Sequence, residues 1–458
     1  MMAFAEGRMI GQWIGRVEGE LPATLRVEIE DRGFGLVGRA YLFYDRADLP
    51  GFLFDINFAK GETLRTKVVT IYLRPAGGVM TVEERQAAEA YIAANFGSGM
   101  PSEIDVEFTS SGSDLTVTWS GIAPVLSDTA GVAKRVWRLI QKAPVADERQ
   151  QGIIPMKLSD PKGVSALTPR TDLTSWDQFR HWATGQYPRN FIFRGQRQPF
   201  KLTSSFHRTW RKNLSLWINQ DIELLFGAVA EHLKYPLQLG NLQHNAAIWS
   251  ILQHHGYPTP MLDWSYSPFV AAYFAFQEAN DANVSPRIFI FDRVAWTNRY
   301  GKAGFTVDAA PNQLVVIETM PTGNPRHAPQ QAISTVTNVA DVEAFVRARE
   351  EADGVTYLTA CDLPFQSRPQ IMRELELMGI TYGSLFPGLD GIWGHAAPDS
   401  GGLGGSSFAA VIRLIRVAAF SLVGDSHESA RQPGLKRRNH GYASENAQNL
   451  WPRPKALR

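Results

Sequence analysis

The residues best suited to chemistry in this sequence form one short polar and aromatic block, Asp-Trp-Ser-Tyr-Ser at 263–267. The glycine and prolines at 256–260 come just before it and predict an extended segment, because these residues end helices. Ser267 followed by Pro268 predicts a helix start, since a hydroxyl caps the first turn and proline there gives up no needed N–H. The helix over residues 269–278 is apolar on nearly every side, so we expect it to be buried. The polar groups at its mouth either build a site or only cap the helix.

An arginine and a glycine at the end of a predicted strand make a second candidate group. Residues 190–193 read Asn-Phe-Ile-Phe, a strand pattern, and Arg194 and Gly195 follow directly. The planar guanidinium of arginine suits phosphate or ribose oxygens, and glycine lets a ligand approach the backbone closely. A structural salt bridge is the alternative role for Arg194.

Patterns for metals and for other nucleophiles are weak, and we predict no metal. The histidines are not arranged as a His-x-x-x-His pair with a glutamate, and the adjacent pair at 254–255 would point about 100° apart on a helix. Cys361 is the only cysteine and has no neighbouring base, so we expect a packed small side chain. The glycine-rich segment at 401–405 lacks the Lys-Ser/Thr of a phosphate loop.

The composition is that of an ordinary soluble globular protein. The 458 residues are 44% hydrophobic and 20% charged, with a formal net charge of +1, so there is no bulk signal for nucleic acid. The sequence shows no apolar run long enough for a membrane span and no secretory signal at its start. With a single cysteine, we expect a cytoplasmic protein and no membrane partner.

The first 125 residues are predicted to form an antiparallel β-rich domain. Apolar and charged residues alternate over 25–30, which predicts a strand with one face in water, and 36–44 predicts its return strand. A capping box of Thr81 and Glu84 begins a helix that ends near residue 95. We expect this domain to bind a partner protein or to pack only on the rest of the chain.

The remaining chain is divided by composition. Residues 126–170 have little periodicity and are predicted to be a linker, with a helix near 132–141. Residues 171–422 mix strands and helices, which makes the whole chain α+β. Residues 423–458 carry an excess of Lys and Arg and few apolar residues, so we expect a solvated tail, with nucleic-acid contact as the alternative.

Motifs along the second region carry a family resemblance. They are Phe-Arg-Gly-Gln at 193–196, Ser-Ser-Phe-His-Arg at 204–208, Gln-His-His-Gly at 253–256, the block and helix at 262–275, and two later segments at 326–331 and 374–391. Taken in this order, over roughly residues 171–395, they resemble the FRG domain. The Arg-Gly pair and the Ser-x-Ser before a small-residue helix are also similar to the layout of ADP-ribosyltransferase folds, which consume NAD.

The resemblance implies NAD as substrate and assigns roles. Arg194 would hold a phosphate or ribose, and the amide of Gly195 would bond the nicotinamide carboxamide. The other implied cofactor-binding residues are Asp263, Trp264, Ser265 and Ser267, with Tyr266 or Tyr273 stacking on the nicotinamide. The alternatives are structural roles. Asp263 and Trp264 would form a structural pair, and the two serines would only brace the strand.

The late position that is usually a glutamate in those folds falls here on Gln330 or Gln331. A glutamine orients a hydroxyl but cannot take its proton. Either another carboxylate serves, with Asp263, Glu374 and Glu376 as candidates, or catalysis depends mainly on strain imposed by binding.

Two functions from different classes follow. The first is an ADP-ribosyltransferase-like enzyme that modifies a macromolecular acceptor or hydrolyses NAD, in a toxin or anti-phage defence role suggested by bacterial proteins of this build. The second is a non-catalytic module that binds a nucleotide or nucleic acid. The enzyme interpretation requires Arg194, Ser265 and Gln330 or Gln331 to line one cleft.

Overall fold

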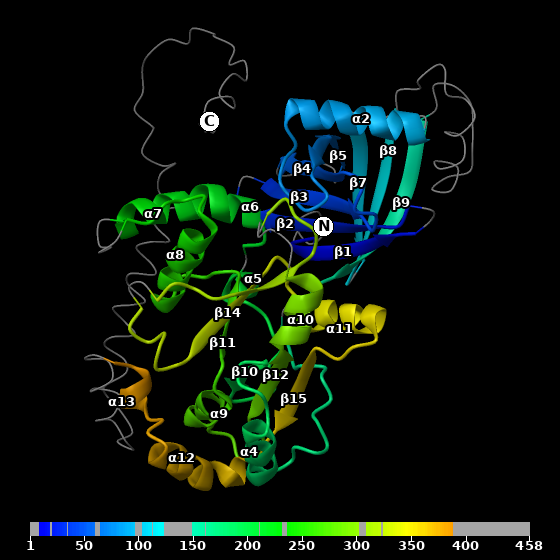
Figure 1. Cartoon of the computed structure of the whole chain (residues 1–458). Coiled ribbons are helices and arrows are strands. Elements are labelled where there is room, and N and C mark those ends of the chain that lie inside the picture. Colours follow the sequence, from blue (N-terminus) through cyan, green and yellow to red (C-terminus); the bar gives the residue numbers. More distant parts are fainter. Residues whose placement is uncertain are drawn as a thin grey trace. The chain divides into compact units, whose positions relative to one another are not determined.

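The computed structural model describes residues 9–18, 21–33, 35–59, 65–96, 103–111, 113–122, 149–160, 162–209, 211–230, 236–301, 308–321 and 324–387. These residues contain two antiparallel sheets, one of nine strands and one of six, together with helices (Figure 1). The α+β class expected from the sequence is confirmed at this level. None of the described helices is both long and apolar enough to cross a membrane.

The first sheet, here the N-terminal sheet, has the strand order β5-β7-β8-β9-β1-β2-β3-β4-β6. Its strands are β1 (Gly11–Val17), β2 (Ala23–Asp31), β3 (Gly35–Tyr44), β4 (Gly51–Ala59), β5 (Arg65–Val69), β6 (Ile71–Leu73), β7 (Glu103–Ser111), β8 (Asp114–Ile122) and β9 (Arg149–Leu158). Helix α2 (Val82–Phe96) begins at the predicted capping box, in which the Thr81 amide donates to Glu84 Oε2 at 2.8 Å.

The N-terminal sheet curves until its two edges approach each other. Residues 66–73, which the sequence presents as one strand, are interrupted at Thr70, and the two pieces β5 and β6 lie at opposite ends of the strand order. A single short run of chain can reach both edges only if those edges are close together in space. Thr66 Oγ1 on β5 accordingly donates to the Asn57 carbonyl on β4 at 3.3 Å.

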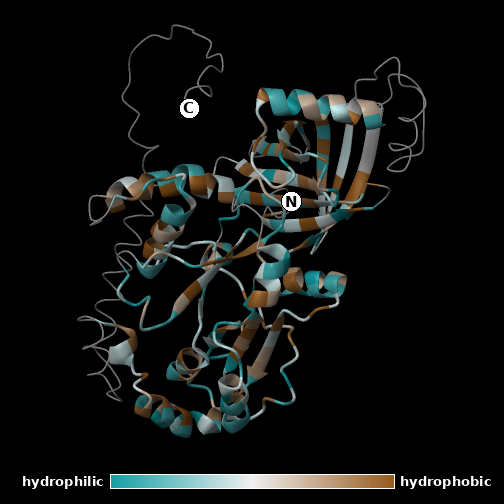
Figure 2. Cartoon of the chain, in the orientation of Figure 1, coloured by the Kyte–Doolittle hydropathy of each residue, from teal (hydrophilic) through white to brown (hydrophobic). Residues whose placement is uncertain are grey.

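The alternating strand β2 corrects one expectation. Its apolar residues Val27 and Ile29 are buried in the core of the N-terminal sheet, as the pattern predicts, and hydropathy alternates along these strands in Figure 2. The charged residues that alternate with them, Arg26, Glu28 and Glu30, are however also buried rather than in water. Arg26 donates to Asn312 Oδ1 at 2.8 Å, and Glu30 Oε2 accepts from the Lys212 amide at 2.8 Å. The face predicted for solvent is covered by the second half of the chain, which alternation within one strand cannot reveal.

The segment predicted as a linker also contains a strand. Strand β9 pairs with β8 from Arg149 to Lys157 and with residues 13–15 in the middle of β1, so it joins these two strands of the N-terminal sheet. Its buried residues Ile154 and Met156 alternate with exposed Ile153, Pro155 and Lys157. Because two of these exposed residues are also apolar, the segment lacks the alternation of hydropathy that would reveal a strand. The predicted helix at 132–141, the end of the second region beyond 387 and the basic tail lie outside the described residues.

The second sheet has the order β13-β14-β11-β10-β12-β15. Its strands are β10 (Phe191–Gln196), β11 (Met261–Ser265), β12 (Arg287–Asp292), β13 (Leu314–Ile317), β14 (Ala332–Thr337) and β15 (Leu358–Asp362). The accompanying helices are α4 (Trp176–Thr184), α5 (Ser205–Arg208), α6 (Leu214–Leu216), η2 (Trp217–Ile222), α7 (Glu223–Ala230), α8 (Leu242–His254), α9 (Pro268–Gln277), α10 (Arg293–Tyr300), α11 (Val342–Asp353), η3 (Phe365–Ser367), α12 (Arg368–Leu377) and α13 (Tyr382–Leu385).

Helices cover both faces of the second sheet. On β12, Ile288 and Ile290 pack in one core with α4, α9 and α12, whereas Phe289 and Phe291 pack in another with α10 and α11. A strand buried on both faces needs no polar alternation, which is why its sequence is a continuous apolar run. Helix α8 packs over the other half of the sheet, against Met261 of β11 and Val336 of β14.

Candidate functional site

The second sheet separates between its two central strands. β10 and β11 share a single register pair, Phe193 with Ser265, whereas β10 follows β12 over six consecutive pairs. Beyond that one pair the two strands diverge. A cleft of about 790 Å³ lies at this divergence and is lined from β10, β11, α8, α9 and the loop before β14, and we call it the β10–β11 cleft. Its volume is in the range of small-molecule and cofactor sites.

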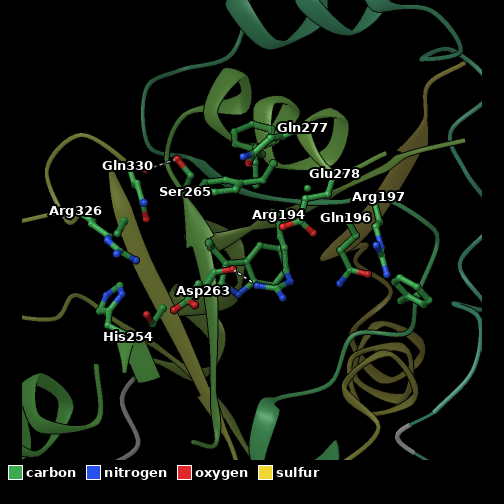
Figure 3. Close-up of a pocket in the computed structure, with 18 of the residues that line it drawn as sticks. Arg194, Gln196, Arg197, His254, Asp263, Ser265, Gln277, Glu278, Arg326 and Gln330 are labelled. Carbon is green, nitrogen blue, oxygen red and sulfur yellow. Dashed lines mark hydrogen bonds between the residues drawn. The ribbon is translucent and has the colours of Figure 1, made fainter. Parts of the chain in front are cut away.

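Arg194 is held at the centre of the β10–β11 cleft. Its Nη1 donates to the Asp263 carbonyl at 2.7 Å, so a side chain bridges the strands where the ladder does not continue (Figure 3). In the amide orientation that satisfies its neighbours, Gln196 accepts from Arg194 Nε at 3.3 Å and donates to the Phe200 carbonyl. Burial lowers the pKa of Arg194 and the Asp263 carboxylate opposes this, but a guanidinium stays cationic at neutral pH.

Gly195 has a packing role that the sequence does not show. A Cβ at this position would lie 1.8 Å from the Ala271 carbonyl oxygen and 2.7 Å from the Ala275 amide nitrogen, both on α9. The glycine therefore lets the backbone of α9 rest directly on β10. Gly195 also lines the cleft, so the predicted bond from its amide to a ligand stays a prediction beside this structural requirement.

The cleft is strongly cationic. Its lining contains the basic side chains of Lys162, Arg194, Arg197, Lys201, Arg208 and Arg326 and the carboxylates of Asp263 and Glu278. Lys201 is paired with Asp341 at 2.6 Å, and Arg326 lies over the ring of Phe386, 5.0 Å from its centroid. Basic groups gathered in a concave surface favour an anionic ligand.

A polar network fixes the floor on the β11 side. Gln253 Nε2 donates to Asp263 Oδ2 at 2.5 Å, and Gln253 in turn accepts a hydrogen bond from Thr259. His254 on the same helix lies 2.6 Å, Nε2 to Nδ2, from Asn324. Burial lowers the pKa of His254, so the ring is neutral at pH 7 and can accept the amide proton.

Ser265, Ser267 and the two glutamines lie around the start of α9. Ser265 Oγ donates to the Gln330 carbonyl at 2.7 Å and accepts from the Ser267 amide at 2.9 Å, so it braces the strand to the loop and the helix. Ser267 is the N-cap of α9 with Pro268 after it, as predicted. Gln330 lines the cleft and its Nε2 donates to the Leu385 carbonyl at 3.0 Å. Gln331 is exposed, has a φ of 47°, and is not part of the lining.

The aromatic candidates lie outside or beneath the cleft. Trp264 lines it but is buried, and its indole donates to Thr335 Oγ1 at 2.9 Å. Tyr266 donates to Glu318 Oε1 at 2.6 Å and does not line the cleft. Tyr273 is buried in the core around α9. Other aromatic residues also line the cleft, namely Phe193, Phe200, Phe274 and Phe386. The ring centroids of Phe274 and Phe386 are 6.1 Å apart in an edge-to-face contact.

Glu374 and Glu376 are not brought to the cleft. Glu374 on α12 accepts from the Trp176 indole at 2.8 Å and pairs with Arg180 at 3.1 Å, which lowers its pKa and ties it to α4. Glu376 is exposed on the same helix. The described residues contain no cluster of His, Cys, Asp and Glu suited to a metal ion.

Sequence reasoning missed several charged residues that line the cleft. Arg197 and Lys201 follow β10 in a loop without periodicity, and Glu278 stands at the end of the predicted buried helix. Their positions in the chain could have identified them. Residues that directly follow a central strand, or that end the helix covering it, lie together at one edge of a sheet.

The fold and site therefore define an α+β protein whose second sheet separates around a cationic cleft. The FRG domain model matches residues 189–284, which contain β10, β11, α8 and α9. The chain thus contains an FRG domain, as the order of its motifs predicts. Searches of curated proteins and of solved structures found no match.

Proposed function

We propose that the FRG domain binds NAD in the β10–β11 cleft and breaks the bond between nicotinamide and ribose. The observation that carries this proposal is the gathering of basic side chains around Arg194. The lining contains six basic groups, of which Lys201 is paired with Asp341, and two carboxylates. A pyrophosphate carries two negative charges, and a guanidinium binds such oxygens with two parallel N–H groups. Arg194 bonds within the described residues through Nη1 and Nε, and none of these bonds uses Nη2, so Nη2 is available to the ligand.

The remaining parts of the cleft suit the other parts of a dinucleotide. Phe274 lines the same space and offers an aromatic ring for a base or for nicotinamide. Asp263 and Glu278 are the carboxylates near enough to line the same space, and a carboxylate stabilises the positive charge that develops on the ribose as nicotinamide leaves. The electron pair of the broken bond stays on nicotinamide, and an acceptor hydroxyl or water adds to the ribose carbon and loses its proton.

Gln330 supports the contrasting candidate, a module that binds a nucleotide without turnover. It lines the cleft, and the resemblance to ADP-ribosyltransferase folds implies a glutamate at this position. A neutral amide cannot remove a proton. In the catalytic proposal that work falls to Asp263, whose carboxylate is already oriented by Gln253.

The test is nicotinamide release from NAD by the full chain, with and without macromolecules from a cell extract. Arg194→Ala should reduce release by about 10- to 100-fold, because a hydrogen bond to a charged group contributes about 1.5–3 kcal/mol. Arg194→Lys keeps the charge and should recover part of the loss. Arg299→Ala, which removes an exposed arginine paired with Asp353 outside the cleft, is the matched control.

The outcomes separate the candidates. Release that requires the extract indicates transfer to a macromolecule, and release without it indicates hydrolysis. An absence of release from folded protein, together with NAD binding that Arg194→Ala abolishes, would support the binding module. An enzyme that consumes NAD would also arrest growth when expressed, as a toxin or defence effector does, and Arg194→Ala would relieve that arrest.

A further inference from the structure

The interior of the N-terminal sheet contains a second cavity, separate from the β10–β11 cleft. It has a volume of about 340 Å³ and is lined by inward-facing side chains of several strands, among them Val27, Ala40, Ile56, Phe108, Val117 and Trp119. Curved sheets of about eight strands that close on themselves are just wide enough to be filled by side chains or to hold one small ligand. In this sheet the side chains leave part of the interior unfilled.

The chemistry of the lining is almost wholly apolar. Charged residues appear only at one end, where Arg16 and Glu18 lie beside the end of β1. Arg16 Nη1 donates to Asp45 Oδ1 at 2.7 Å and its Nε lies 3.7 Å from Glu18, so its charge is already neutralised. Trp13 and Met156 are buried in the same core and do not line the cavity.

One polar group is placed inside the cavity wall. Tyr44, at the end of β3, lines the cavity, and its hydroxyl has no hydrogen-bond partner in the described part of the chain. Its ring is held edge-to-face against Phe52, with centroids 6.1 Å apart. Burial raises the pKa of Tyr44, so the hydroxyl stays neutral and can donate to a ligand.

We propose that this apolar cavity binds one small uncharged amphiphile, an alkyl chain of about ten to twelve carbons with a hydroxyl or similar head that bonds Tyr44. Apolar protein cavities stay dry, and a cavity of about 150 Å³ takes one benzene, so a volume a little over twice as large takes about twice as many carbons. A peptide strand is disfavoured because the inner strands already pair on both edges, and a helix of about 10 Å diameter does not fit. The proposal does not depend on the activity of the FRG domain.

The experiment is calorimetric titration of the full chain with 1-decanol and, separately, with decanoate. We expect one decanol per chain with a dissociation constant of roughly 1–100 µM, from the usual binding free energy per heavy atom. Decanoate should bind more weakly, because its carboxylate would be desolvated beside a rim that offers no unpaired cation among the described residues.

Two variants locate the site. Ala40→Phe fills the cavity from β3 and should weaken decanol binding at least tenfold while leaving the unfolding temperature equal or higher, since the space exists. Tyr44→Phe keeps the ring and should weaken binding about three- to tenfold by removing one hydrogen bond. Val69→Phe is the matched control, because Val69 is exposed on the outer side of β5, next to cavity-lining Val68, and should leave binding unchanged.

Several results would overturn the proposal. They are an absence of saturable decanol binding by the folded chain, equal binding by folded Ala40→Phe, or tighter binding of decanoate than of decanol. If Ala40→Phe does not fold, Val117→Leu, which adds less volume from β8, takes its place and should weaken binding in the same direction.

Discussion

Gly195→Ala is the sharpest test of how the site is built, because one added carbon meets backbone atoms on two turns of α9. The new Cβ would lie 1.8 Å from the Ala271 carbonyl oxygen and 2.7 Å from the Ala275 amide nitrogen. Ordinary van der Waals contact begins near 3.4 Å, so α9 would have to move away from β10 by more than an ångström. Neither atom belongs to a flexible side chain that could rotate aside.

This displacement of α9 should lower the free energy of unfolding. Overpacking in a well-packed core costs about 1–3 kcal/mol, and a clash with a fixed backbone belongs at or above the upper end. In a domain of this size about 3 kcal/mol corresponds to roughly 6–12 °C in unfolding temperature. Moving α9 also shifts Phe274 and Gln277, which line the cleft, so ligand affinity should fall as well.

The assay is thermal unfolding of the full chain, with Gly227→Ala as the matched control. Gly227 lies in α7, and a Cβ added there would meet nothing within 4 Å, so alanine should stabilise the chain by up to about 1 kcal/mol through helix propensity. An unfolding temperature of Gly195→Ala within a degree or two of the parent would refute the packing argument. A normal unfolding temperature with lost ligand binding would instead assign Gly195 to the ligand.

Three further predictions concern buried ionisable groups. Burial lowers the pKa of His207 to about 3, so this ring is protonated in the unfolded chain before it is protonated in the fold. The free energy of unfolding should therefore fall by about 1 kcal/mol from pH 6.5 to pH 5.5. Denaturant titrations of His207→Asn should lack this fall. Burial raises the pKa of Glu28 to about 7, so the stability that its protonated form gives the fold is lost as pH rises from about 4.5 through 7. Glu28→Gln should flatten this fall in the free energy of unfolding, and an unchanged pH profile would contradict the prediction. Burial raises the pKa of Cys361 to about 12, so this thiol should resist a disulfide reagent in native protein and react in denaturant.

Local signals in the sequence were sufficient for the elements that local chemistry determines. The capping box at Thr81 and the Ser267-Pro268 start of α9 each predict a helix whose bounds agree with the structure within a residue or two. Capping and apolar periodicity act over one or two turns, so they can be recognised without knowing what the segment contacts.

Contacts between distant segments decided the rest. Arg26, Glu28 and Glu30 alternate like a solvated face but are buried. Besides their local ion pairs, Arg26 and Glu30 form hydrogen bonds with residues more than a hundred positions away. The linker prediction likewise missed β9, which pairs with the preceding strand β8 and with β1, more than a hundred residues earlier in the sequence.

The candidate site shows the same division. Its motif residues Arg194, Ser265 and Gln330 could be chosen from sequence, and they do line one cleft. Glu374 was an equally reasonable carboxylate, yet its bonds to Trp176 and Arg180 hold it elsewhere. Residue type states what a side chain can do, whereas the divergence of β10 from β11 and the packing of α9 on Gly195 determine which side chains share a space. That arrangement depends on backbone geometry across the whole sheet, which no local stretch of sequence encodes alone.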